Sequence, residues 1–147
     1  MRTITVALGE KTYNIEIAAG LLDQIGAKAR VLSQAVKAAI ISDSNVDPLY
    51  GERLERSLAA SGFEVTRIVF AAGEQSKNLT VLGQVYDELA RAGLTRSDLI
   101  LTLGGGVPGD LGGFAAATFL RGIDFIQVPT SLLAQIDSSV GGKVAID

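Results

Sequence analysis

Hydrophobic and polar positions along the chain follow two different periods in turn. Residues 3–8 (TITVAL) and 12–18 (TYNIEIA) alternate with period two around a Gly-Glu-Lys turn, which predicts a β-hairpin. Farther along, stretches with apolar residues at helical spacing alternate with short runs that are typical of strands. The pattern predicts helices at 20–32, 43–62, 78–93, 108–120 and 131–140, and strands at 37–42, 63–70, 98–104 and 124–130.

Residue types at the ends of these segments support the assignment. The helix over 43–62 opens with Asp and Asn, carries Pro48 near its first turn and closes on Gly62. The helix over 78–93 begins at a capping Asn78 and ends at glycine. The helix over 108–120 is apolar almost all round, so we expect it to be buried.

The alternation of strands and helices predicts the fold class. Short turns between the elements are typical of an α/β, Rossmann-like, doubly wound and mainly parallel sheet, preceded here by the N-terminal β-hairpin. The length of 147 residues is that of one domain, which we place at 1–147. Ligands bind such sheets outside the carboxyl ends of the strands. That rule selects four groups of candidate residues: 43–45, 73–77, 104–110 and 130–131.

Composition excludes several classes of function. The net charge of −3 gives no electrostatic footprint for nucleic acid, and the absence of cysteine excludes disulfides and thiolate metal sites. The N-terminus has no signal-peptide core, and the most apolar stretch is too short and too rich in glycine to span a bilayer. We therefore expect a soluble, cytoplasmic protein that binds neither nucleic acid nor membrane.

The chain contains no histidine, which is the commonest general base near neutral pH and the commonest metal ligand. If the chain is a complete enzyme, its acid–base chemistry must come from Asp, Glu, Lys, Arg and Tyr. If it is part of an enzyme, the missing chemistry lies elsewhere. The C-terminal residues VGGKVAID resemble the start of another element and favour the second interpretation.

The stretch 101–110 (LTLGGGVPGD) places three glycines after a predicted strand and before a predicted helix. Gly104, Gly106 and Gly109 satisfy the G-x-G-x-x-G pattern, in which a helix N-terminus binds a pyrophosphate. The alternative is a glycine-rich turn that serves only strand–helix packing. The usual dinucleotide-binding motif follows the first strand of the sheet, whereas this stretch follows a later strand. Asp124 has the spacing of a ribose-binding acid, but it precedes its strand and so falls at the wrong end of the sheet.

Residues 103–147 (LGGGVPGDLGGFAAATFLRGIDFIQVPTSLLAQIDSSVGGKVAID) resemble the central signature of the 3-dehydroquinate synthase family of sugar-phosphate cyclases. The upstream segments SDSNV and GEQSKNL are similar to the same family. The resemblance implies an N-terminal NAD-binding α/β domain, matched by this chain, and a mainly helical C-terminal domain that lies beyond it. It also implies a divalent metal, zinc or cobalt. The family's metal ligands, one glutamate and two histidines, belong to the second domain, so none is expected here.

The resemblance implies specific contacts with NAD. The glycine-rich loop would lie against the dinucleotide, and the residues after the first strand of the parallel sheet would hold the adenosine ribose. Pro108 departs from the family, where an aliphatic residue or threonine is more common, and Ser131 replaces the second threonine of a Thr-Thr pair. The expected cofactor-binding residues are Asp43, Ser44, Asn45, Glu74, Lys77, Gly105, Gly106, Val107, Asp110, Thr130 and Ser131. The simpler interpretation of Asp43 is a helix cap.

For the substrate, the resemblance implies contacts from Arg121, Asp137 and Lys143. Arg121 would bind phosphate across the interface of a homodimer formed by the full-length protein. Its alternative role is that of a cation at the C-terminal end of a helix, where it complements the helix dipole.

The implied reaction converts 3-deoxy-D-arabino-heptulosonate 7-phosphate into 3-dehydroquinate and phosphate, a lyase step of the shikimate pathway toward chorismate and the aromatic amino acids. NAD is used and regenerated within each turnover. Without the metal ligands, we expect residues 1–147 alone to be inactive. Three alternatives stay open: another NAD-dependent sugar-phosphate cyclase, a metal-dependent dehydrogenase similar to glycerol dehydrogenase, and an NAD-binding module without catalysis.

Overall fold

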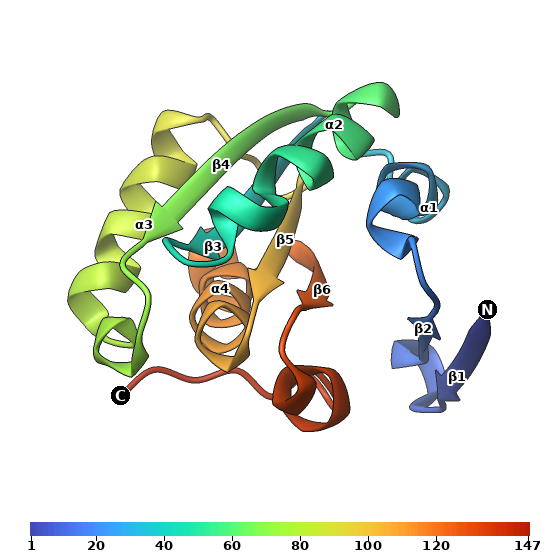
Figure 1. Cartoon of the computed structure of the whole chain (residues 1–147). Coiled ribbons are helices and arrows are strands. Elements are labelled where there is room, and N and C mark those ends of the chain that lie inside the picture. The colour runs from blue at the N-terminus through green and yellow to red at the C-terminus, as the bar shows by residue number, and fades with distance from the viewer.

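A parallel four-stranded sheet lies at the centre of the structure, a computed structural model that describes all residues from 1 to 147 (Figure 1). Its strand order is β4-β3-β5-β6, and every neighbouring pair is parallel. The four predicted strands are confirmed within two residues at each end. The strands are β3 (Lys37–Asp43), β4 (Glu64–Phe70), β5 (Leu99–Gly104) and β6 (Asp124–Pro129).

Helices cover both faces of this sheet, as the predicted doubly wound fold requires (Figure 1). Alternate residues of each strand point to opposite faces. Ile40 and Leu101 therefore belong to the hydrophobic core under α1 and α2, whereas Ile41 and Ile100 belong to the core under α3 and α4. The helices are α1 (Ile25–Leu32), α2 (Glu52–Ala60), α3 (Leu79–Arg91) and α4 (Gly106–Thr118). None of them combines the length and apolar character that crossing a bilayer requires.

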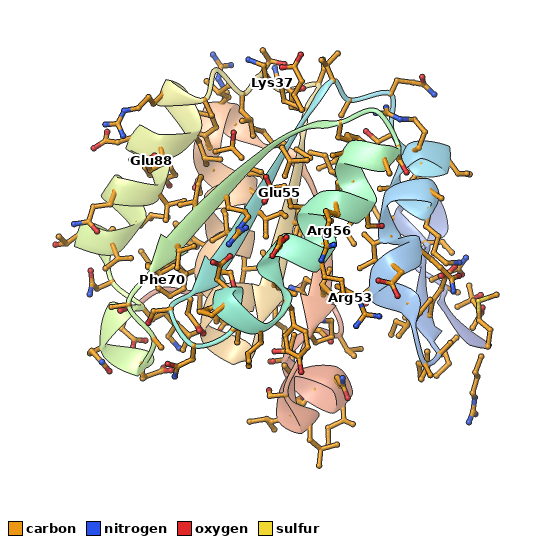
Figure 2. All side chains as sticks on the ribbon, turned by 45° about the horizontal axis from the view of Figure 1, so that its top comes forward. Lys37, Arg53, Glu55, Arg56, Phe70 and Glu88 are labelled. Atoms are coloured by element: carbon orange, nitrogen blue, oxygen red, sulfur yellow. The ribbon has the colours of Figure 1, made fainter.

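Local chemistry explains where these helices begin. The side chain of Asn78 accepts a hydrogen bond from the Val81 N–H, which confirms the predicted cap of α3. A π-type turn, η3 (Asp47–Gly51), precedes α2, and Arg67 of β4 holds both segments through Asp47 at 2.7 Å and Glu55 at 2.9 Å. Figure 2 shows Glu55 on α2 facing this strand. Helix α4 is buried along most of its length, as its composition predicts.

The predicted hairpin is confirmed and stands apart from the main sheet (Figure 1). Strands β1 (Arg2–Val6) and β2 (Tyr13–Ile17) pair antiparallel and are largely exposed. Two polar contacts join these strands to the remainder: Glu16 pairs with Lys28 of α1 at 2.7 Å, and the Tyr13 hydroxyl accepts a hydrogen bond from the Gly141 N–H at 2.8 Å.

The helix predicted over 131–140 is confirmed in its central part and is shorter at both ends. Residues 132–138 are helical, and the π-type segment η6 (Ala134–Ser138) makes up most of this stretch. Gly141 and Gly142 follow with φ of +88° and +66°, which turns the chain out of a helical path. Leu132, Leu133 and Ile136 are exposed, so no core face holds a longer helix in place. Short 3-10 turns complete the chain: η1 (Gly9–Lys11), η2 (Leu21–Gln24), η4 (Glu74–Ser76) and η5 (Phe119–Arg121).

Candidate functional site

The carboxyl ends of the four parallel strands meet at one edge of the sheet. Figure 2 labels Phe70 at this edge, at the end of β4, and Lys37 at the opposite edge, where β3 begins. Asp43 ends β3, Gly104 ends β5 and Thr130 follows β6, so segments far apart in sequence converge there. Asp124 begins β6 opposite Leu99, which confirms that it lies at the other edge.

The glycine-rich loop is held in one conformation by contacts at Gly104. Its φ is +152°, and a Cβ there would lie 2.5 Å from Cγ of Pro108. The Gly104 carbonyl accepts a hydrogen bond from the Thr130 N–H at 2.9 Å, which joins the loop to the end of β6. Only glycine allows this close approach between the strand end and the first turn of α4.

The outer side of the glycine-rich loop has open space beside it where α4 begins. A Cβ on Gly109 would meet nothing within 4 Å, and one on Gly106 would have only the Ser138 hydroxyl nearby, at 3.7 Å. Gly106 and Val107 open the helix ahead of its first intrahelical hydrogen bond, from the Gly109 N–H to the Gly105 carbonyl at 3.3 Å. Free N–H groups at the positive end of a helix dipole fit an anion such as a diphosphate.

Asp43 is buried, and it has a structural role in addition to its candidate role in ligand binding. Its Oδ1 accepts hydrogen bonds from the N–H groups of Asn45 and Val46, both at 2.9 Å, so it caps the turn after β3. Its Oδ2 makes no hydrogen bond within the chain and is free to accept one from a ligand. The Ser44 hydroxyl accepts a hydrogen bond from the Ala72 N–H at 2.9 Å, which fixes the turn against the loop after β4.

Lys77 connects three acidic side chains beside α4. Its Nζ lies 2.7 Å from Glu74, 3.6 Å from Asp110 and 3.8 Å from Asp147. The hydrogen bond to Glu74 is the main reason that the pKa of Lys77 is raised. Burial raises the pKa of Asp110, although Lys77 opposes this shift. The last residues run past α4 toward the start of α3 (Figure 1), where the Asp147 N–H donates to the Lys77 carbonyl at 3.0 Å.

The three candidate substrate residues do not all lie together. Lys143 and Asp137 are exposed near η6, and Nζ of Lys143 lies 2.9 Å from Oδ1 of Asp137. Ser131 is close to the loop, because a Cβ on Gly105 would lie 3.4 Å from its hydroxyl. Arg121 instead precedes β6 and so lies at the opposite edge of the sheet.

Sequence reasoning missed three residues that shape this edge. Gln127 lies inside β6 with its carboxamide buried below the glycine-rich loop. The Tyr13 hydroxyl contacts Gly141, which lies after η6, and Asp147 pairs with Lys77. A polar residue inside an apolar strand is a signal that could have identified Gln127. The contacts of Tyr13 and Asp147 depend on tertiary structure and leave no local pattern. No group of three or more His, Cys, Asp and Glu side chains has the arrangement of a metal site.

Comparisons with known proteins extend this picture. The model of the family described as 3-dehydroquinate synthase N-terminal matches residues 67–147. The 3-dehydroquinate synthase of Clostridium acetobutylicum is 54% identical over 147 residues, 100% of this chain and 41% of that protein. That of Enterococcus faecalis is 53% identical over 144 residues, 98% of this chain and 40% of that protein. The chain thus spans about two-fifths of the length of these curated relatives.

A solved structure is similar over nearly the whole chain. The 2-deoxy-scyllo-inosose synthase complexed with carbaglucose-6-phosphate, NAD+ and Co2+ has a TM-score of 0.90 at 26% identity, and the match covers 99% of this chain and 40% of that one. A family model that matches more than half of the chain and relatives above 50% identity agree with this fold. The chain belongs to the 3-dehydroquinate synthase N-terminal family.

Proposed function

We propose that this chain is the dinucleotide-binding domain, residues 1–147, of a 3-dehydroquinate synthase. Such an enzyme converts 3-deoxy-D-arabino-heptulosonate 7-phosphate into 3-dehydroquinate and phosphate. One observation carries the proposal: identity to 3-dehydroquinate synthases is 54% over the whole chain, against 26% to the structurally similar synthase of another cyclic product. The difference favours this reaction over that of another sugar-phosphate cyclase.

NAD fits the carboxyl edge of the sheet. The bare glycines and the free N–H groups at the start of α4 suit its diphosphate, and the similar inosose synthase has NAD+ in its complex. When bound, NAD supplies a hydride acceptor that oxidises a substrate alcohol and returns the hydride later. We propose that Gly105, Gly106, Val107 and Asp110 hold the diphosphate side of the cofactor, that Asp43, Ser44 and Asn45 hold the adenosine ribose, and that Glu74, Lys77, Thr130 and Ser131 complete the site.

The carboxylate of Asp43 favours NAD over NADP at this site. Its free Oδ2 can accept hydrogen bonds from ribose hydroxyls, while its negative charge repels the additional phosphate of NADP. Because Oδ1 is held by two backbone N–H groups, the carboxylate is fixed in orientation before the ligand arrives.

Charged side chains near η6 suit an anionic substrate. Lys143 is exposed and only 2.9 Å from Asp137, so an incoming carboxylate or phosphate can exchange for this partner. Arg121 lies at the opposite edge of the sheet from Lys143. We therefore propose that it serves the site of a second subunit in a homodimer.

A divalent metal does not fit these residues. The similar inosose synthase has Co2+ in its complex, but no group of His, Cys, Asp and Glu side chains in this chain is arranged to hold a metal. We assign no step of the reaction to a metal held by residues 1–147. Its ligands would come from the part of a full-length relative that this chain does not span.

A turnover assay of a full-length protein that carries this chain tests the proposal. With NAD and zinc, we expect phosphate release from the heptulosonate phosphate and formation of 3-dehydroquinate. Faster turnover of another sugar phosphate would identify a different cyclase. Net reduction of NAD by a polyol, without phosphate release, would identify a dehydrogenase.

A further inference from the structure

Gln127 is a polar residue in an otherwise apolar part of β6, where it lies opposite Thr102 of β5. Its Nε2 and Oε1 atoms are both buried, and neither forms a hydrogen bond within the chain. A carboxamide offers two donors and two acceptors, and burying it without partners is unfavourable. An unsatisfied buried group of this kind calls for a partner that the chain itself does not supply.

A small cavity adjoins this carboxamide directly below the glycine-rich loop. Its volume of about 10 Å³ is close to the space that one water molecule needs. Most of the residues around it offer polar groups, as a buried water requires. They include Thr102, Gly104, Gly105, Gln127, Ser138 and Ser139.

Three parts of the chain meet at this cavity: the end of β5 with the glycine-rich loop that follows it, the end of β6, and η6. The Gly104 carbonyl already accepts one hydrogen bond from Thr130, and the Gly105 carbonyl accepts one from Gly109. Each carbonyl has a second lone pair that a water molecule can use. A single water can therefore connect the carboxamide to the loop without displacing an existing bond.

We propose that Gln127 is a positioning residue: its carboxamide holds one buried water that bridges to the loop backbone and to the Ser138 hydroxyl. This bridge fixes the orientation of the N–H groups at the start of α4. The inference depends on the proposed function only in naming NAD as the ligand that those groups meet.

Gln127→Met tests the inference, because methionine has nearly the same shape but forms no such hydrogen bonds. Gln34→Met is the matched control, since Gln34 is exposed and far from the loop in sequence. We expect Gln127→Met to weaken NAD binding by about tenfold, the effect of one lost hydrogen bond of ordinary strength. Without NAD, amide hydrogen exchange at residues 105–109 should become faster, and the control should match wild type in both measurements.

Normal NAD affinity and normal loop exchange in Gln127→Met, whatever its melting temperature, would overturn the inference. If that variant does not fold, Ser138→Ala removes the other end of the bridge and should accelerate the same exchange. A wild-type chain that does not bind NAD would contradict the proposed function, while loop exchange still decides the role of Gln127. A crystal structure should show a water within hydrogen-bonding distance of the carboxamide, and a direct bond from Gln127 to Ser138 would exclude the bridge.

Discussion

Gly106 carries no side chain where a diphosphate would approach α4. In Gly106→Ala, the added methyl meets only the Ser138 hydroxyl at 3.7 Å, so stability should not fall. NAD affinity should fall at least about tenfold, because overpacking costs about 1–3 kcal/mol. Gly83→Ala in α3 is the control: its Cβ meets nothing within 4 Å, and it should add up to about 1 kcal/mol of stability with unchanged affinity. Thermal unfolding measures stability, and calorimetric titration measures NAD affinity. Unchanged NAD affinity in Gly106→Ala would show that the loop does not contact the diphosphate.

The negative charge of Asp43 and its role in capping the turn after β3 can be tested separately. Asp43→Asn keeps an Oδ1 that accepts from the Asn45 and Val46 N–H groups, so the turn should persist. The preference for NAD over NADP should narrow by about tenfold, since a hydrogen bond to a charged group is stronger than a neutral one. Calorimetric affinities for both nucleotides test this, and a wild-type protein without a preference would contradict the ribose assignment.

Candidate site residues differed in how far the sequence could identify them. The turn residues after each strand could be located, because the rule for parallel sheets depends only on strand direction. The dual role of Asp43 could not, since its hydrogen bonds depend on the path of the turn. Gln127 was missed although it is a polar residue within an apolar strand, because the rule for parallel sheets selects only residues that follow a strand.

At the scale of elements, the turn between α4 and β6 is strained. Leu120 and Arg121 have φ of 51° and 66°, in the left-handed region that costs non-glycine residues about 1–2 kcal/mol each. Arg121→Gly should therefore keep or raise stability, while it removes the guanidinium proposed to bind substrate phosphate. In a full-length enzyme, we expect a sharply higher KM with a melting temperature within a few degrees of wild type. Normal kinetics in a destabilised variant would assign Arg121 to the fold.

Asp98 joins the turn before β5 to the first residue of β3. Its carboxylate accepts hydrogen bonds from the N–H groups of Lys37 at 2.9 Å and Thr95 at 2.7 Å. Burial alone would raise the pKa of Asp98, but these hydrogen bonds outweigh it and hold the pKa below the ordinary 3.8. The carboxylate therefore stabilises the fold above pH 3.8, and this contribution is lost as pH falls through the lower pKa of the folded state.

Asp98→Asn should thus lower the free energy of unfolding at pH 7 by about 1–3 kcal/mol. The difference from wild type should shrink below pH 3.8. Asp87→Asn makes the same charge change at an exposed position and is the control. Denaturant unfolding across this pH range is the measurement, and a difference independent of pH would exclude the carboxylate as its source.

The elements themselves were largely predictable, for physical reasons that differ among them. Strands β3 and β5 are buried on both faces and appear as continuous apolar runs, and α3 has both a capping side chain and an apolar face. The helix over 131–140 was predicted slightly too long, because helical spacing in the sequence does not show where the chain leaves the helical path ahead of Gly141 and Gly142. Leu132, Leu133 and Ile136 of this helix are exposed, and only Ala134 is buried.

At the scale of the whole molecule, we expect residues 1–147 to fold alone, because a core lies on each face of the sheet. They should not release phosphate from the heptulosonate phosphate, even with NAD and zinc. The proposed turnover would need a metal to polarise the substrate alcohol, and no side-chain group in residues 1–147 is arranged to hold one. A phosphate-release assay on purified residues 1–147 measures this, and metal-dependent release above a heat-inactivated control would contradict the location of the metal site.

The bond between Tyr13 and Gly141 has a consequence for protein synthesis. The two residues are 128 positions apart, and a ribosome adds about 5–20 residues each second. The Tyr13 hydroxyl therefore leaves the ribosome about 6–25 s before its partner Gly141. During that interval the Glu16–Lys28 ion pair is the contact that can hold β1 and β2 against α1, and the outer edges of both strands are unpaired. Docking of the hairpin therefore takes two steps that are separated by synthesis of the residues between Lys28 and Gly141, and a partly docked hairpin offers strand edges to other nascent chains.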